Sequence, residues 1–409
     1  MNAQDRLLRY VVVNTESKEN ADQTPSTSCQ MAFAKLLAEE MRELGLSDVY
    51  TDEHAYVYGV LPATAGKENC PCVGWIAHLD TVDELGVQPI HPRVVKDYDG
   101  GAVQLGTSGR ELTPEQFPDL KNAIGKTLIT TDGTSILGAD DKAGIAAILT
   151  ACERLQQEHI PHGRIAVCFT PDEEIGHGAS LLDLARFGAS AAYTVDGSAP
   201  WEVEYETFNA AKADWTIAGV SVHPGEAKGK MVNALLVGME INAMLPAEET
   251  PAQTEGYQGF YHLCSMSGGV DAAQMSYIVR DHDMKWLEQR KQNMRDIERK
   301  INQTYGDGTA MLCLRDQYRN MAEIIAQHPE VVERANAAIR KVGFQPTSNP
   351  VRGGTDGSQL SFRGLPCPNL GTGAYALHGP YEHVIVEQLH AVVQMLVYLA
   401  EEYAQDGDN

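Results

Sequence analysis

The fold is organised around the stretch Thr134-Ser-Ile-Leu-Gly-Ala-Asp-Asp-Lys-Ala-Gly-Ile-Ala-Ala-Ile-Leu149. It places two adjacent acids, Asp140 and Asp141, between a glycine turn and an apolar run. From Ile145 to Leu155 apolar residues recur at helical spacing, which predicts a buried helix. Asp before a helix acts as an N-cap and complements the positive end of the helix dipole. The pair is therefore either a helix cap or part of a functional site, and the remaining motifs distinguish these interpretations.

The composition is that of an ordinary globular protein. The chain has 409 residues, 43% hydrophobic and 22% charged, and this length predicts two domains. A formal net charge of -24 argues against nucleic acid or an anionic membrane surface as a partner. No run of about 18 apolar residues occurs, so we expect no membrane span.

The cysteines and the amino terminus favour a cytoplasmic, reducing setting. Met1–Tyr10 carries charges and lacks the apolar core of a signal peptide. The eight cysteines are scattered, and Cys70-Pro-Cys72 has the wrong spacing for a zinc knuckle. We therefore expect free thiols.

Three predicted strands end in polar residues. The runs Val73–Ala77, Ile165–Thr170 and Ala192–Val195 lead into His78-Leu-Asp80, Pro171-Asp-Glu-Glu174 and Asp196. Other predicted elements are the helices Ser28–Leu44 and Ile145–Leu155 and the strands Ala55–Leu61 and Thr127–Thr130. This alternation predicts a doubly wound α/β domain, whose sites lie at the carboxyl ends of its strands. Residues 84–126, rich in Gly, Pro and Asp, are expected to form surface excursions.

The pattern changes after residue 207. The order of predicted elements becomes β-α-β-β-α-β, which fits a ferredoxin-like module. These elements are Ala211–Val220, Asn233–Leu245, Gly259–Met266, Ala273–Arg280, Met284–Gln303 and Ala310–Leu314. Helices at Glu330–Val342 and Val386–Tyr403 then restore α/β character. We predict one α/β domain, 1–207 plus 319–409, with an inserted α+β domain, 208–318.

The polar residues at strand ends form a mixed nitrogen and oxygen set that suits zinc or a similar divalent ion. The set is His78, Asp80, Asp140, Glu173, Glu174 and Asp196, joined by His378 from a late glycine-rich stretch. Asp80 lies two residues after His78 and so points the same way on an extended backbone, where it accepts the other ring N–H. Glu173 and Glu174 should point to opposite sides, one toward metal and one toward water. Alternatively, His78 is a core histidine and the glutamates end a solvated loop.

Five ordered motifs together resemble the M20 metallopeptidase family. They are His78-Leu-Asp80, Gly138-Ala-Asp-Asp-Lys-Ala-Gly144, Pro171-Asp-Glu-Glu174, Asp196-Gly and His378-Gly. The resemblance implies a zinc-peptidase-like catalytic domain with a lid domain that also makes a homodimer. It implies two Zn²⁺ per subunit, bridged by Asp140, with His78 and Asp196 on one and Glu174 and His378 on the other. Glu173 would be the general base and Asp80 would orient His78. The peptide bond Asp140–Asp141 would be cis.

The resemblance also points to substrate-binding residues in the inserted domain. His223, in Ser221-Val-His-Pro-Gly225, would stabilise the oxyanion across the dimer, and Arg280 would pair with the carboxyl terminus of a peptide. Asn233 and, more weakly, Arg352 are further candidates. The alternatives are a surface turn before Pro224 and a glycine-rich turn with an Asx cap around Asp356.

The resulting functional hypothesis is a dizinc aminopeptidase that releases the amino-terminal residue of tripeptides. An M20-type dipeptidase, carboxypeptidase or N-acyl amino acid deacylase shares the same site chemistry. A catalytically silent binding module is the alternative from another class, but every ligand and the base are present. The sequence lacks both the GxSxG elbow of serine hydrolases and HExxH. Pro380-Tyr381 departs from the Lys-His that we associate with tripeptide-cleaving members.

Overall fold

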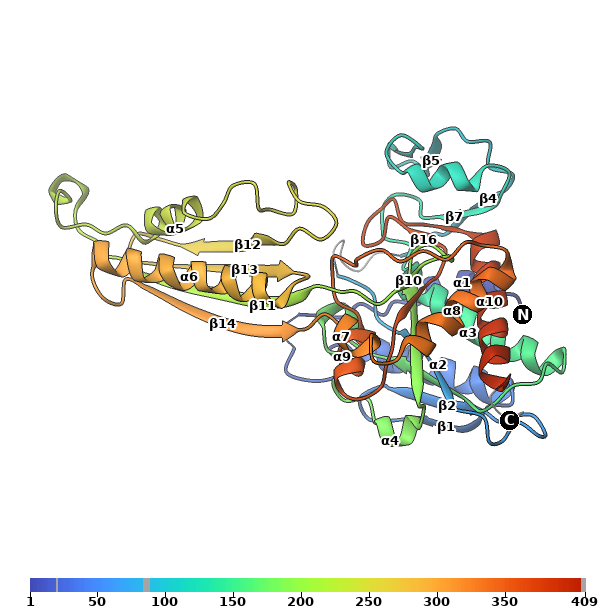
Figure 1. The fold of residues 1–409 in the computed structure, drawn as a ribbon. Coiled ribbons are helices and arrows are strands. Elements are labelled where there is room, and N and C mark those ends of the chain that lie inside the picture. Colours follow the sequence, from blue (N-terminus) through green and yellow to red (C-terminus); the bar gives the residue numbers. More distant parts are fainter. Residues whose placement is uncertain (20, 84–88, 406–409) are drawn as a thin grey trace. The chain divides into compact units, whose positions relative to one another are not determined.

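The structure is a computed structural model that describes residues 1–19, 21–83 and 89–405 (Figure 1). The chain divides into two compact units. The larger comprises Met1–Tyr205, Glu323–Asn349 and Thr355–Asn409, and the smaller comprises Glu206–Ala322 and Pro350–Gly354. The short segment Pro350–Gly354, which includes Arg352, thus lies with the smaller unit, whereas the sequence assigns it to the α/β domain.

A seven-stranded sheet forms the centre of the larger unit, in the order β1-β2-β8-β3-β9-β15-β10. The strands are β1 (Ser47–Thr51), β2 (Val57–Leu61), β3 (Val73–His78), β8 (Ile165–Thr170), β9 (Ala191–Gly197), β10 (Val203–Glu204) and β15 (Asn369–Gly371). The four central strands β8, β3, β9 and β15 are parallel, and the outer pairings are antiparallel. Central strands that are buried on both faces read as apolar runs, which is why the sequence predicts them well.

Helices cover both faces of this sheet (Figure 1). One face shares the main core with α1 (Ala3–Val11), α2 (Ser28–Glu43), α3 (Ala139–Gln157), α8 (Pro329–Val342) and α10 (Val386–Ala404). The other face packs with α4 (Leu184–Phe187) and α9 (Asp356–Phe362) around a smaller core. The predicted α/β class is confirmed. Among the described residues, no helix combines the length and apolarity needed to cross a membrane.

Close packing of α3 against β9 depends on one glycine. A Cβ at Gly144 would lie 2.0 Å from the carbonyl oxygen of Val195 and 2.3 Å from Oδ1 of Asp141. Both distances are below any real carbon contact, so a side chain here would push the helix away from the sheet. Gly144 therefore allows the start of α3, with Asp140 and Asp141, to approach the strand that ends in Asp196.

Residues 84–126 form more than surface excursions. Residues 84–88 lie outside the described residues, but the remainder contains β4 (Arg93–Val95), β5 (Val103–Leu105) and β6 (Arg110–Leu112). Strand β4 joins β7 (Leu128–Thr130), β17 (His383–Ile385) and β16 (Ala374–Tyr375) in a second sheet of the larger unit. This region has its own small core, which includes Tyr98, Leu105, Leu112 and Leu120. The apolar residues are too sparse in sequence to reveal it.

The smaller unit has the predicted ferredoxin-like order. Its elements are β11 (Asn209–Ala218), α5 (Ala234–Ala243), β12 (Phe260–Gly268), β13 (Ala272–Asp281), α6 (Met284–Tyr305) and β14 (Ala310–Tyr318). The strands form an antiparallel sheet in the order β12-β13-β11-β14. Trp215, Tyr277, Met294 and Ile301 are buried between this sheet and the two helices. A short helix, α7 (Ala322–Ile325), follows.

Helix α1, which the sequence analysis does not predict, is anchored by a buried ion pair. Glu40 on α2 accepts hydrogen bonds from Nε of Arg6 at 2.8 Å and from the hydroxyl of Tyr10 at 2.8 Å. The Arg6 side chain is only 2% exposed and also pairs with Glu153 at 2.8 Å. Breaking a buried pair leaves a charge without compensation, which costs more than the intact pair contributes.

We therefore expect Glu40→Ala to lower the free energy of unfolding by about 3 kcal/mol. Urea unfolding of the variant measures the loss. The control is Glu39→Ala, which removes the neighbouring but exposed carboxylate and should change stability by less than about 0.5 kcal/mol. Equal effects of the two substitutions would contradict the anchoring role of Glu40.

Candidate metal centre

The predicted ligands gather at one edge of the main sheet. Strand β3 ends at His78, the adjacent parallel strand β9 carries Asp196 next to its last residue, and β8 leads into Glu173 and Glu174. Because β8, β3 and β9 are parallel neighbours, their carboxyl ends meet at the same edge. The start of α3 adds Asp140 to this group.

The carboxylate of Asp140 lies between two imidazoles. Its Oδ1 is 2.9 Å from Nε2 of His78, and its Oδ2 is 3.0 Å from Nε2 of His378. The two histidines are 300 residues apart in sequence. The peptide bond between Asp140 and Asp141 is cis, as the family resemblance predicts.

One further carboxylate flanks each imidazole. Asp196 Oδ1 is 3.4 Å from Nε2 of His78, and Glu174 Oε2 is 3.1 Å from Nε2 of His378. Two groups of three residues each bring their ligand atoms within 4.8 Å of one another. The first group is His78, Asp141 and Asp196, and the second is His78, Asp140 and Glu174. All five predicted ligands are thus brought together, and Asp141 lies beside them.

The electrostatics of the cluster call for positive charge. Burial raises the pKa of Glu174 to about 7 and that of Asp196 well above its ordinary value. Burial lowers the pKa of His78, but Asp196, Asp140 and Asp80 outweigh it, so the net shift is strongly upward. Burial also acts against the charged form of His378, yet Asp140 and Glu174 raise its pKa to about 11. The surrounding carboxylates therefore favour the positively charged form of both imidazoles.

A divalent cation fits the same donor set. Two imidazole nitrogens and several carboxylate oxygens are the ligands that zinc prefers. Oε1 of Glu174 is buried and has no hydrogen-bond partner among the described residues. An unpaired buried carboxylate oxygen is costly in a folded protein, and a bound cation would remove that cost.

Asp80 holds the turn that carries the two glutamates. Its carboxylate accepts the backbone N–H of Glu173 at 2.9 Å and that of Glu174 at 3.1 Å. Nδ1 of His78 is 3.0 Å from the carbonyl oxygen of Asp80 and 3.4 Å from its Oδ1. The Asp80 carboxylate therefore contacts both the imidazole and the glutamate turn.

The predicted backbone of the glutamate pair is wrong. The sequence predicts an extended strand end at Glu173 and Glu174, but β8 ends at Thr170 and Glu173–Ile175 form a 3-10 turn. The turn forms because both N–H groups point toward Asp80. The two carboxylates still differ in their contacts. The carboxylate of Glu174 contacts His378, whereas the carboxylate of Glu173 makes no hydrogen bond to any described residue. Burial raises the pKa of Glu173 well above its ordinary value.

Asp140 and Asp141 divide the two roles that the sequence leaves open. Oδ1 of Asp141 accepts the N–H of Gly144 at 3.1 Å, as a helix cap does, and its Oδ2 accepts the N–H of His78 at 3.1 Å. Asp140 instead faces the imidazoles. Helical periodicity predicts the position of the cap. It does not predict that Asp141 also fixes the end of β3 by accepting the N–H of His78.

Three buried acids beside the site are not among the predicted site residues. Asp172 accepts hydrogen bonds from the N–H and hydroxyl of Ser26, Asp356 accepts one from the hydroxyl of Thr170, and Glu382 accepts four backbone N–H groups. Their sequence signal is proximity to motif residues, because Asp172 and Glu382 each lie within four residues of a predicted ligand. Asp356 has no such signal beyond its glycine-rich surroundings.

The other four predicted residues lie in the smaller unit. His223 is exposed, and its Nδ1 accepts the N–H of Gly225 at 3.1 Å, which leaves the proton of the neutral ring on Nε2. Asn233 caps α5, because its side-chain oxygen accepts the N–H of Leu235 at 3.0 Å. His223 thus presents a donor to solvent, while the Asn233 oxygen is already used.

The two arginines make contacts within the smaller unit. Nη1 of Arg280 donates to the carbonyl oxygens of Ala211 and Val279, and the residue is 8% exposed. Arg352 donates to the carbonyl oxygens of Gly256 and Gln258 at 3.0 and 2.7 Å. Its guanidinium also lies 5.2 and 5.4 Å from the ring centres of two phenylalanines, Phe208 and Phe260. Arg352 therefore fixes a loop of the smaller unit.

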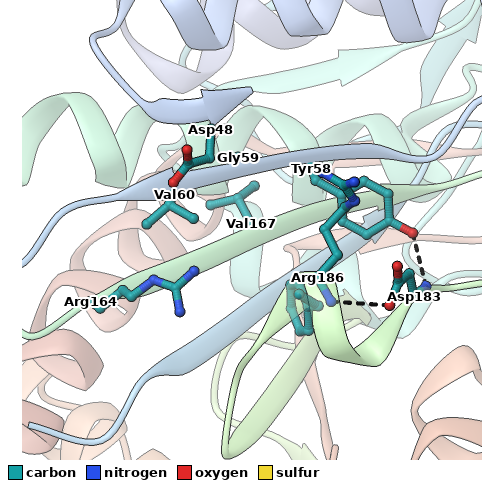
Figure 2. A pocket seen from close by; sticks show the side chains of 9 residues that line it. Asp48, Tyr58, Gly59, Val60, Arg164, Val167, Asp183 and Arg186 are labelled. Carbon is teal, nitrogen blue, oxygen red and sulfur yellow. Dashed lines mark hydrogen bonds between the residues drawn. The ribbon is translucent and has the colours of Figure 1, made fainter. Parts of the chain in front are cut away.

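A separate cavity of about 420 Å³ lies over β2 and β8 (Figure 2). Its charged lining residues are Asp48, Arg164, Asp183 and Arg186. Arg164 precedes β8 and Glu173 follows it, and a strand of this length spans roughly 17 Å. The cavity contains none of the predicted site residues. Asp183 caps α4 and Arg186 stacks on Tyr50, so this lining largely serves the fold.

Sequence comparison assigns the family. Residues 138–402 match the model of peptidase family M20/M25/M40. Peptidase T of Aliivibrio fischeri is 48% identical over 398 residues, which is 97% of this chain and 97% of that protein. Peptidase T of Caldanaerobacter subterraneus is 47% identical over 405 residues, 98% of this chain and 99% of that protein. The chain belongs to peptidase family M20/M25/M40, as its motifs predict, and is a peptidase.

Solved structures agree on the fold. Aminopeptidase PepT from Bacillus cereus matches with a TM-score of 0.75 and 26% identity, covering 98% of this chain and 99% of that one. A tripeptidase from Staphylococcus aureus matches with a TM-score of 0.77 and 23% identity, covering 99% and 98%. Both matches extend over the α/β elements and the inserted ferredoxin-like elements.

We expect Asp80→Asn to reduce peptide hydrolysis by about 10- to 100-fold. The amide retains the shape but replaces one acceptor oxygen with a donor, so the Glu173–Glu174 turn loses one of its two anchors. Steady-state rates on a short peptide provide the measurement. The matched control is Asp183→Asn, since Asp183 also accepts two backbone N–H groups, from Ala185 and Arg186. Normal activity of Asp80→Asn would contradict the role given to Asp80.

Proposed function

We propose that this protein is a dizinc aminopeptidase that releases the amino-terminal residue from tripeptides. The observation that carries the proposal is the sharing of the Asp140 carboxylate between His78 and His378, each with a further carboxylate beside it. The relatives named peptidase T and the Bacillus cereus aminopeptidase support the substrate class.

The proposed ligands follow from these contacts. Asp140 would bridge two zinc ions, with His78 and Asp196 on one and Glu174 and His378 on the other. When bound, zinc supplies Lewis acidity that lowers the pKa of water and polarises a carbonyl group. The protons that the imidazole Nε2 atoms share with Asp140 would be released on binding, because a ligating imidazole must be neutral.

Glu173 is the proposed general base. Its carboxylate has no hydrogen-bond partner among the described residues, so it is available to water. Burial raises its pKa, and a base whose pKa approaches the working pH takes and returns protons most effectively. Glu173 would accept a proton from the attacking water and deliver it to the departing amine, while Asp80 holds the backbone of its turn.

The smaller unit would supply substrate contacts and the dimer interface. The exposed Nε2–H of His223 is suited to donate to the oxyanion, and we propose that it acts across a homodimer formed through this unit. Arg280 would pair with the peptide carboxylate. For Asn233 and Arg352 the observed contacts favour an indirect role, in which they shape the segments around the substrate.

A reducing, cytoplasmic setting is part of the proposal. All eight cysteines are free thiols, and four of them are buried. Disulfide-free proteins with several thiols are typical of reducing compartments.

The first test combines metal analysis with a peptide panel. We expect about two zinc ions per chain by mass spectrometry, and hydrolysis of Ala-Ala-Ala that stops on chelation and returns with Zn²⁺. Di-, tri- and tetrapeptides with free or blocked amino termini define the specificity. Preference for blocked termini or dipeptides would replace the aminopeptidase with a deacylase, a dipeptidase or a carboxypeptidase. Absence of both metal and restored activity would leave a silent binding module.

We expect Glu173→Gln to lower kcat by about 10²- to 10⁴-fold, because the amide cannot accept a proton. Zinc content should remain at the level of the unmodified protein, since Glu173 is not a proposed ligand. Measuring metal content and kcat on the same sample separates loss of the base from loss of the site. Hydrolysis at the normal rate with zinc bound would refute the mechanism.

A further inference from the structure

The Glu382 carboxylate binds the backbone of the loop that contains Asp140. Its carboxylate accepts four consecutive backbone N–H groups. Oε2 accepts those of Leu137 and Gly138, both at 2.7 Å, and Oε1 accepts those of Ala139 and Asp140, at 2.7 and 3.1 Å. The side chain is 1% exposed.

Four successive N–H groups converge only when the backbone is curved around an anion. Gly138, at the centre of the loop, has a φ of 72°, in the left-handed region that favours glycine. Such a concave run of N–H groups is a known binding arrangement for anions. Here the anion is a side chain of the protein itself, so the curvature of the loop depends on Glu382.

The same turn supplies an imidazole to Asp140. His378 and Glu382 lie four residues apart, and the N–H of Glu382 donates to the carbonyl oxygen of Gly379 at 3.2 Å. Asp140 is thus held at two points: its side chain contacts Nε2 of His378 at 3.0 Å, and its backbone N–H contacts Glu382 at 3.1 Å. One short turn fixes both the position of the carboxylate and one of its partners.

The residues between His378 and Glu382 do not disturb this arrangement. Pro380 and Tyr381 lie between the two contact residues. Tyr381 packs against Phe117, with ring centres 5.2 Å apart, so it faces the small core of the second sheet rather than Asp140. Tyr381 therefore leaves both contacts to the Asp140 loop intact.

We propose that Glu382 is a positioning residue that sets the metal affinity of the site by holding the backbone of the Asp140 loop. The inference rests on the proposed metal-dependent function but concerns a residue that contacts no metal. Asp140 is shared by both proposed ion positions, so a displacement of its loop weakens both at once. A group behind a ligand typically changes metal affinity by about 10- to 100-fold when it is removed.

Glu382→Gln is the sharpest substitution. Glutamine has the same shape but one acceptor oxygen, and its NH₂ group would face two of the four N–H donors. The loop would have to open to relieve this conflict. Glu387→Gln is the matched control, because the exposed Glu387 on α10 also accepts a backbone N–H, that of Thr127, with both carboxylate oxygens.

The test is a competition titration of the metal-free full-length protein with Zn²⁺ and a chromophoric chelator. We expect Glu382→Gln to bind zinc about 10- to 100-fold more weakly than the unmodified protein and Glu387→Gln to bind it normally. Zinc binding by Glu382→Gln at normal affinity would overturn the proposal. Peptide hydrolysis at saturating zinc should recover more fully than at limiting zinc, which a general loss of structure would not produce.

Glu382→Asp keeps the proposal testable if the glutamine variant does not fold, as judged by circular dichroism. The shorter aspartate retains its charge but cannot reach all four N–H groups, so we expect a smaller loss of zinc affinity. Unchanged affinity of a folded Glu382→Asp would then overturn the proposal. Failure of the proposed function gives a different result from failure of this inference. If the proposed function is wrong, the unmodified protein binds zinc but does not cleave tripeptides. If this inference is wrong, the unmodified protein cleaves tripeptides and the Glu382 variants bind zinc with normal affinity.

Discussion

The site depends on one carboxylate shared by two imidazoles. Asp140 sits between His78 and His378, and the surrounding acids are too buried to remain charged without positive partners. Two requirements follow: the chain must deliver both imidazoles to one point, and it must supply cations there. The parallel strand β3 delivers His78, and the turn between β16 and β17 of the second sheet delivers His378. Protonation or a divalent ion meets the second requirement.

Backbone contacts give the cluster its rigidity. Asp80 accepts two N–H groups from the glutamate turn, Asp141 accepts that of His78, and Glu382 accepts four from the Asp140 loop. In each case a buried acid that contacts backbone N–H groups fixes a residue that faces the centre of the site. Charge-assisted hydrogen bonds of this kind are stronger than neutral ones and resist displacement.

Local sequence patterns predict the structure correctly where they coincide with burial. The central strands read as apolar runs, and the β-α-β-β-α-β order of the smaller unit follows from its periodicity. Local patterns do not predict a conformation whose cause lies elsewhere in the chain. Glu173 and Glu174 form a turn because Asp80, more than ninety residues earlier, accepts their N–H groups. Arg352 has the residue type of a substrate ligand, yet its guanidinium is occupied by loop carbonyls and phenylalanine rings.

The sequence alone determined the family, the α/β class with its inserted ferredoxin-like module, and the residues that could bind metal. These properties are encoded in motifs and periodicities that need no knowledge of distant partners. Tertiary structure alone decided which acid of the Asp140–Asp141 pair faces the imidazoles, which carboxylates hold backbone, and that Glu382 belongs to the site. Those assignments depend on contacts between segments up to about 245 residues apart, and such contacts exist only after the chain has folded.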